Sequence, residues 1–250
     1  MTDPARLGPD DLLSVLAGTY LRNVLRSDGA CTYCGGWTNP GFSTCFVCGG
    51  MPADAFPNVA GFMTYGANGT TAGTLMYGYK GEQATPGQLA VVKLLIHRGL
   101  RHVTCAELLA GAPVTHCSTV PSTRGRGAHP LDGLVQPQAR WPQHHLVHVT
   151  GRQPVRQTVQ TDLFVAPLLP KMAHVLVVDD TWTSGNKPLS AVTTLWSAGA
   201  ERVSLLCLAR WLSFDFIRRP ATQPVGLHAT LVGQATYHLD ICPFTGGPCP

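Results

Sequence analysis

The chain has 250 residues, of which 44% are hydrophobic and 13% are charged, and this balance excludes an intrinsically disordered protein. It predicts one ordinary globular domain plus a small module, and the net charge of +4 is too small to argue for a nucleic-acid-binding protein. No apolar run has the length of a membrane span, and the first residues lack the basic and apolar regions of a signal peptide. We therefore expect a cytoplasmic protein with no membrane segment.

An amphipathic helix is predicted near the N-terminus, beginning at Asp10 or Asp11. Apolar residues recur at helical spacing along one stripe, at Leu13, Leu16, Tyr20 and Val24. We expect this segment, residues 1–28, to pack against the rest of the protein. Binding of a partner protein by the same stripe is the alternative.

Two CxxC pairs separated by ten residues follow the helix, and each pair is followed by Gly-Gly, which allows a tight turn. Four thiolates satisfy a tetrahedral Zn²⁺ and leave no open coordination position, so the pattern predicts a structural zinc ribbon over residues 29–52. A disulfide pair or a redox-active CxxC is the alternative. Residues 31–50 contain no Lys or Arg, which argues against nucleic-acid binding by the ribbon. The predicted ligands are Cys31, Cys34, Cys45 and Cys48.

Residues 51–79 show no clear period and are predicted to form a linker and then an extended segment. A helix should follow, with Thr85 as its N-cap, Pro86 in its first turn and Gly99 just beyond its end. The next strand is predicted over residues 114–120.

Two arginines among glycines, Arg124 and Arg126, follow this strand. They fit a clamp for pyrophosphate or another anion, or else a simple exposed basic turn. A short helix is expected over residues 129–135 and a strand over residues 144–149, whose histidines we interpret as strand or surface residues. The polar segment 150–162, with Arg152 and Arg156, is either a loop that closes over a phosphorylated ligand or an inert connection.

A buried strand is predicted over residues 175–178, an unbroken and mostly β-branched run typical of a parallel sheet. Asp179 and Asp180 follow at its carboxyl end, where open α/β sheets bind ligands. A hydroxyl-rich turn, residues 181–185, then leads into a helix over residues 187–198, capped by Ser184 or Asn186. With the next strand over residues 202–209, this gives the strand–helix–strand pattern of a parallel crossover.

The chemistry of this stretch follows from its position. Backbone amides of the turn and of the helix N-terminus form a phosphate site, and Gly185 permits close approach of the backbone. The two carboxylates can accept hydrogen bonds from sugar hydroxyls or face Mg²⁺, which prefers oxygen ligands. The pattern indicates a ribose 5-phosphate held at both ends, and the alternative is a buried strand whose acidic pair only caps a turn.

The remaining cysteines divide into two groups. Cys105, Cys117 and Cys207 lie in apolar contexts and are interpreted as core residues. Cys242 and Cys249 near the C-terminus are interpreted as free thiols, with pairing or metal binding as the alternative.

The run Val-Leu-Val-Val-Asp-Asp-Thr-Trp-Thr-Ser-Gly, residues 175–185, resembles the phosphoribosyl pyrophosphate (PRPP) motif of type I phosphoribosyltransferases. The resemblance implies an α/β fold over residues 53–250, a type I phosphoribosyltransferase-like parallel sheet flanked by helices. It also implies catalytic roles for Asp179 and Asp180 and a Mg²⁺ ion bound with PRPP. The implied PRPP-binding residues are Asp179, Asp180, Thr181, Trp182, Thr183, Ser184 and Gly185, and Arg124, Arg126 and Arg152 are assigned to the pyrophosphate.

The order of elements across most of residues 25–210 resembles the ComF family, competence-associated proteins with an N-terminal zinc ribbon on a phosphoribosyltransferase domain. The shared features are the ribbon, a Tyr-Lys-Gly segment at 79–81, a Val-Pro strand end, an Arg-Gly loop and the PRPP motif. The family continues its Val-Pro strand end with Arg-Gly-Phe-Asn-Gln. Here Arg126 and Gly127 match, whereas Ala128, His129 and Pro130 replace the last three residues.

Three functions are compatible with these patterns. The first is an enzyme that transfers ribose 5-phosphate from Mg²⁺-PRPP to an unknown acceptor. The second is a non-catalytic PRPP- or nucleotide-binding module that acts through protein partners in DNA uptake or processing. Binding of single-stranded DNA led by the ribbon is the least favoured of the three, because the ribbon lacks cations.

Overall fold

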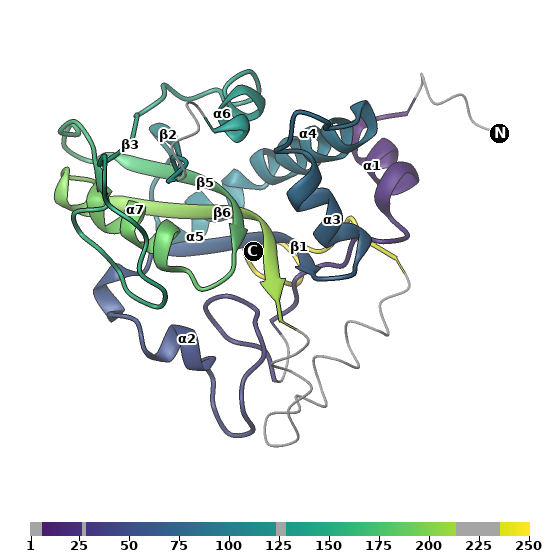
Figure 1. The fold of residues 1–250 in the computed structure, drawn as a ribbon, viewed down its shortest axis with the longest axis horizontal. Helices are drawn as coiled ribbons and strands as arrows, with labels where there is room; N and C mark the ends of the chain where they lie inside the picture. Colours follow the sequence, from purple (N-terminus) through teal and green to yellow (C-terminus); the bar gives the residue numbers. More distant parts are fainter. Residues whose placement is uncertain (1–6, 27–28, 124–128, 214–235) are drawn as a thin grey trace.

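A four-stranded parallel sheet forms the centre of the computed structural model, which describes residues 7–26, 29–123, 129–213 and 236–250 (Figure 1). Each neighbouring pair of strands is parallel, and Val177 lies opposite Leu205 in the central pair. This arrangement, with helices on both faces, confirms the predicted α/β class. Across the sheet the strands are β1 (Val59–Ala67), β6 (Arg202–Leu212), β5 (His174–Trp182) and β2 (His116–Thr119).

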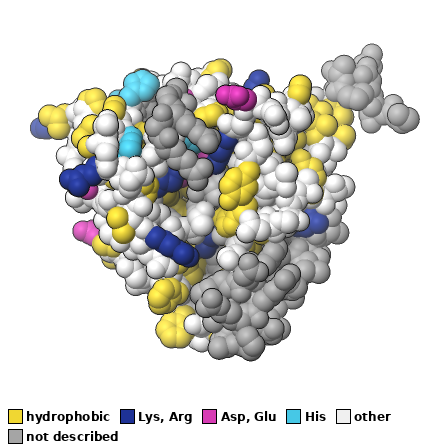
Figure 2. Space-filling view, in the orientation of Figure 1, with side chains coloured by type: hydrophobic (Ala, Val, Ile, Leu, Met, Phe, Trp, Pro, Cys, Tyr) yellow, Lys and Arg dark blue, Asp and Glu magenta, His cyan; other side chains and the backbone are white. Residues whose placement is uncertain are grey.

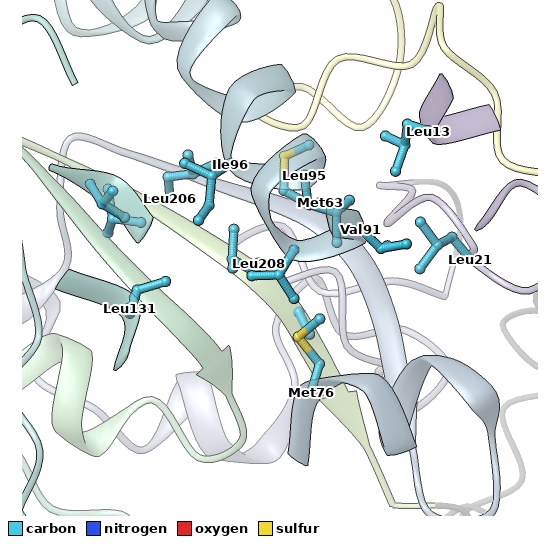
Figure 3. Packing of buried hydrophobic residues seen from close by; sticks show 14 of the residues in the cluster. Leu13, Leu21, Met63, Met76, Val91, Leu95, Ile96, Leu131, Leu206 and Leu208 are labelled. Carbon is cyan, nitrogen blue, oxygen red and sulfur yellow. The ribbon is translucent and has the colours of Figure 1, made fainter. Parts of the chain in front are cut away.

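Alternate side chains of the central strands point to opposite faces of the sheet, and each face has its own core. Leu206 and Leu208 of β6 point into the first core, where Figure 3 shows them beside Leu95 and Ile96. No helix within the described ranges combines the length and apolarity needed to cross a bilayer. The helices of the first core are α1 (Pro9–Ala17), α3 (Thr71–Gly78), α4 (Pro86–Arg101), α5 (Val103–Ala110) and α6 (Pro130–Val135).

The second face is covered by α7 (Asn186–Ser197) and by the four-cysteine segment, which contains the short helix α2 (Phe46–Gly49). Val177 and Leu205 are fully buried there. A one-turn 3₁₀ helix, η2 (Ala53–Ala55), links the cysteine segment to β1. A separate antiparallel pair, β3 (Val147–His148) and β4 (Phe164–Val165), replaces the longer strand expected over residues 144–149.

The sequence predicts a linker and then an extended segment over residues 51–79. The extended part is strand β1, and the segment after it is helix α3, which the sequence did not predict. Most of β1 is buried on both faces, so the alternation that reveals a half-exposed strand is absent. Gly61 and Gly66 also hide the strand pattern, and Gly61 is needed because a Cβ there would lie 2.6 Å from the Phe244 ring.

The N-terminal helix is shorter than the apolar stripe predicts. It ends at Ala17, so Tyr20 and Val24 belong to the irregular segment that follows, and Leu16 is 43% exposed. Leu13 and Leu21 nevertheless reach the first core and are fully buried. The segment therefore packs as expected, through a shorter helix, with Leu13 and Val24 of the predicted stripe and with Leu21 in addition.

The predicted start of α4 is confirmed, with Thr85 in a capping box and Pro86 in the first turn. Its predicted end is wrong, because the helix runs past Gly99 to Arg101. A Cβ at position 99 would lie 2.6 Å from Leu206, so Gly99 serves close packing of the helix on β6. At α7 the N-cap is Gly185, without a side-chain cap.

Candidate functional site

Two buried carboxylates lie near the carboxyl end of the central strand β5, which continues beyond the predicted residues 175–178 to Trp182. Asp179 is 2% exposed and Asp180 is 4% exposed. Charged groups are rarely buried without partners, so the contacts of each carboxylate show whether its charge is compensated within the protein.

Asp180 is surrounded by donors from two other elements. Its Oδ2 lies 2.5 Å from Lys80 Nζ, accepts a hydrogen bond from Tyr79 Oη at 3.1 Å, and lies 3.2 Å from His129 Nε2. Burial opposes ionisation of Asp180, but His129 and Lys80 outweigh it and lower the pKa of this carboxyl. Burial and the neighbouring Asp180 raise the pKa of Tyr79, so Tyr79 remains a neutral donor.

His129 holds one defined tautomer between α6 and β5. Its Nδ1 accepts a hydrogen bond from the Leu131 amide at 3.0 Å and thereby caps α6. A neutral imidazole with an accepting Nδ1 carries its hydrogen on Nε2, which faces Asp180. Both ring nitrogens are thus engaged.

Asp179 is much less satisfied than its neighbour. Its Oδ1 accepts the Asp180 amide at 2.9 Å, while Oδ2 is buried and has no hydrogen-bond partner among the described residues. Burial, and secondly the charge of Asp180, raise the pKa of Asp179 to about 6. A buried carboxylate oxygen without a partner fits a ligand hydroxyl or an oxygen-preferring cation such as Mg²⁺.

A cavity of about 790 Å³ opens beside Asp180, between α3, α6 and the start of α7. Its lining includes two lysines, Lys80 and Lys187, and two carboxylates, the buried Asp180 and the exposed Glu82. Figure 2 shows scattered Lys and Arg side chains and few acidic ones on the described part of the face it draws. The cavity wall also includes the polar side chains of Gln83, Ser122, Thr123 and His129.

The turn after the acidic pair is held in place by its own packing. Trp182 is 1% exposed and contacts Phe62 edge to face, with the ring centroids 5.7 Å apart. Gly185 has φ of +75°, and a Cβ on it would lie 2.4 Å from the Trp182 ring. Trp182 therefore packs inward, and only its backbone is available to a ligand in this conformation.

A second cavity of about 490 Å³ lies beside the end of this turn, on the side of the cysteine segment. Thr183 and Ser184 line it together with Arg156 and Arg210. The Ser184 hydroxyl donates to Asn186 Oδ1 at 2.6 Å. The predicted residues are thus divided: Asp180 lines the first cavity, Thr183 and Ser184 line the second, and Asp179 and Thr181 line neither of these two cavities.

Of the three predicted pyrophosphate arginines, one lies among the described residues. Arg124 and Arg126 lie outside the described residues. Arg152 is exposed and forms an ion pair of 2.7 Å with Asp162. The segment between Arg152 and Asp162 contacts the start of α7, because Asn186 Nδ2 donates to the Val155 carbonyl at 2.8 Å.

The sequence did not identify four residues of this site: Tyr79, Lys80, His129 and Lys187. A signal existed for the first three of them. Tyr79 and Lys80 belong to the Tyr-Lys-Gly segment shared with the ComF pattern, and His129 stands where that pattern has Asn. Neither signal indicates that both segments fold onto Asp180.

The four predicted zinc ligands come together. The Sγ atoms of Cys31, Cys34, Cys45 and Cys48 all lie within 4.8 Å of one another, and Cys34 and Cys45 are 3.7 Å apart. The four side chains are buried free thiols, and amides of Gly36 and Cys48 point at sulfur atoms at 3.4 Å. Four thiolates at these spacings fit a closed tetrahedral metal site, as Zn²⁺ prefers.

Arg210 connects this metal site with the turn after β5. Its buried guanidinium donates to the carbonyls of Trp182 and Thr183 at 3.3 and 3.4 Å. A Cβ on Gly36 would lie 2.3 Å from Arg210 Nη2, so the knuckle glycine allows the close contact. Burial opposes the charge of Arg210, but the Cys34 thiolate and its neighbours outweigh it and raise the pKa.

No family model and no curated protein matches the chain. Among solved structures, it is similar to UMP synthase of Leishmania donovani, with 15% identity over 58% of this chain and a TM-score of 0.30. This chain spans 35% of that protein's length. It is also similar to a purine phosphoribosyltransferase from Pyrococcus horikoshii, with 13% identity, a TM-score of 0.28, and coverage of 48% of this chain and 87% of that one.

Proposed function

We propose that this protein binds PRPP, or a closely related phosphosugar diphosphate, with Mg²⁺ and transfers its ribose 5-phosphate to an acceptor. The observation that carries the proposal is the acidic pair near the carboxyl end of β5, where one buried oxygen of Asp179 has no hydrogen-bond partner among the described residues. The adjoining cavity supplies lysines, and the hydroxyl-rich turn leads into α7.

Each part of the ligand has a proposed set of partners. Asp179 and Asp180 accept hydrogen bonds from the ribose hydroxyls, and the amides of residues 181–185 bind the 5-phosphate. Lys80 and Lys187 face the diphosphate. Arg124, Arg126 and Arg152 remain assigned to the same group as expectations from the sequence.

Breaking the bond between C1 and the diphosphate oxygen leaves positive charge on the sugar and negative charge on the leaving group. Asp179 and Asp180 then stabilise the sugar cation, and Lys80 and Lys187 stabilise the departing anion. A Mg²⁺ ion bound at the free Asp179 oxygen would neutralise further charge of the diphosphate. The loop of residues 150–162, which contacts the start of α7, would exclude water from the reacting centre.

The second candidate is a binding protein that senses PRPP or a nucleotide and acts through protein partners in the cytoplasm. One observation favours it: both ring nitrogens of His129 are engaged, so this histidine is not free to act as a general base. The ComF resemblance points to partners in DNA uptake or processing. Direct nucleic-acid binding is not favoured, because residues 31–50 lack Lys and Arg.

Both candidate functions require that the protein binds PRPP, and calorimetry with PRPP and Mg²⁺ tests this binding. Wild-type protein should bind, Asp180→Asn should bind at least about tenfold more weakly, and Asp54→Asn, on the 3₁₀ helix away from the cavity, should bind like wild type. Absence of binding by folded wild-type protein would overturn both candidates. Pyrophosphate release with any acceptor base, abolished in Asp179→Asn, supports the enzyme, and tight binding without release on every acceptor supports the sensor.

A further inference from the structure

We propose that the protein contains a second structural zinc site, formed by His102, Cys105, Cys242 and Cys249. One ligand atom of each side chain lies within 4.8 Å of the ligand atoms of the other three. The site is separate from the four-cysteine ribbon and from the proposed phosphosugar site.

The spacing of the ligand atoms fits a tetrahedral ion. His102 Nδ1 lies 3.8 Å from Cys105 Sγ and 3.5 Å from Cys249 Sγ. Bond lengths of about 2.3 Å for Zn–S and 2.0–2.1 Å for Zn–N place tetrahedral sulfur and nitrogen ligands about 3.5 Å apart. The same His102 atom faces both sulfurs, as a metal-binding imidazole requires.

The turn at Cys242 repeats the geometry of a ribbon knuckle. The Gly246 amide donates to the Cys242 carbonyl at 2.9 Å, and Gly246 has φ of +69°. In the ribbon, the Gly35 amide donates to the Cys31 carbonyl at 2.8 Å, and Gly35 has φ of +64°. The sequence Cys-Pro-Phe-Thr-Gly thus builds the same tight turn around a sulfur ligand as the first CxxC-Gly pair.

The ligands come from two well-anchored parts of the chain. His102 ends α4 and begins α5, and Cys105 lies in the first turn of α5. The C-terminal segment is fixed independently of any metal, because the Phe62 amide donates to the Pro243 carbonyl at 2.9 Å and Tyr237 Oη donates to the Met63 carbonyl at 3.0 Å. The four proposed ligands are therefore held close together by the fold before any metal binds.

A disulfide bond explains the clustering of these four side chains less well than a metal ion does. Three cysteines form at most one disulfide, which leaves one thiol beside the imidazole, whereas one zinc ion uses all four ligands. Three protein thiolates and one imidazole leave no open position, so we infer a structural role. The ion would clamp the C-terminal segment to the junction of α4 and α5.

Metal analysis of the full chain, purified under reducing conditions, tests the proposal. Wild-type protein should contain two zinc ions, and X-ray absorption should give an average of 3.5 sulfur and 0.5 nitrogen ligands per zinc, as one Cys₄ and one Cys₃His site require. Cys249→Ser and His102→Ala should each retain one zinc. His102→Cys should retain two, and so should the control His97→Ala, which changes another histidine of α4.

Cys249 is the exposed member of the cluster, so Cys249→Ser should leave the fold intact by circular dichroism. This variant separates loss of metal from loss of fold. Cys31→Ser should remove the other zinc and leave the nitrogen-containing site. One zinc in wild type with an all-sulfur shell, or two zincs in folded Cys249→Ser, would overturn the proposal.

Discussion

The Lys80 ammonium lies 2.5 Å from Asp180 Oδ2, which joins the segment after α3 to the end of β5. Both residues line the cavity, and the lysine is the more exposed of the two, with 27% of its side chain exposed against 6% for Asp180. A phosphosugar diphosphate would compete for both members at once, because its hydroxyls suit the carboxylate and its phosphates suit the ammonium. The two residues therefore compensate each other's charge.

Replacing Lys80 with Met should weaken PRPP binding about tenfold or more, because a cation facing the diphosphate is lost. Lys93→Met is the matched control, since Lys93 is exposed on α4 and does not line the cavity. Calorimetry in the presence of Mg²⁺ gives both affinities. Equal affinities of the Lys80→Met and Lys93→Met variants for PRPP would show that Lys80 does not contribute to binding.

Asp179→Asn should change how stability depends on pH. The pKa of Asp179 is raised to about 6 from an ordinary value of 3.8, so the folded state binds its proton more tightly than the unfolded chain. This group therefore makes the wild-type protein less stable as pH rises from about 4 to about 6. Asn does not titrate, so the variant should gain about 1–3 kcal/mol relative to wild type across this window.

Urea unfolding between pH 4 and pH 8 in magnesium-free buffer measures this difference. Asp180 has a lowered pKa and contributes the opposite slope, but it is present in both proteins and largely cancels. A difference in the free energy of unfolding that does not vary with pH would show that Asp179 is already satisfied in the folded state.

The sequence was sufficient to predict those features that one short segment determines. The β-branched run before Asp179 predicts β5, and the cysteine spacing predicts which four thiols meet. Strand β1 was not predictable in the same way, because Gly61 and Gly66 and burial on both faces remove its periodic signal.

The partners of Asp180 depend on long-range packing, which sequence spacing does not encode. Lys80 and His129 reach the carboxylate only because α3 and α6 lie at the same end of the sheet. The same limit applies to Cys242 and Cys249, interpreted as free thiols for lack of complementary ligands. His102 and Cys105 supply those ligands from a distant helix junction.

Gly185→Ala should destabilise the protein by about 2–4 kcal/mol, because it combines a left-handed backbone with a collision against the Trp182 ring. Gly133→Ala, in α6, is the matched control, since a Cβ there meets nothing within 4 Å and should stabilise by about 0.5–1 kcal/mol. Urea unfolding followed by tryptophan fluorescence compares the two. Similar stabilities for both variants would mean that the turn after β5 has room to relax.

Arg210→Met should accelerate loss of zinc from the four-cysteine site, because it removes the buried cation beside the Cys34 thiolate. The carbonyls of Trp182 and Thr183 would also lose a donor, so we expect stability to fall by about 1–3 kcal/mol. Measured in a Cys249→Ser background, chelator competition follows the ribbon alone. Arg202→Met, at the opposite end of β6, is the control and should release zinc like its parent. Equal release rates for the two arginine variants would show that the ribbon holds its ion without help from β6.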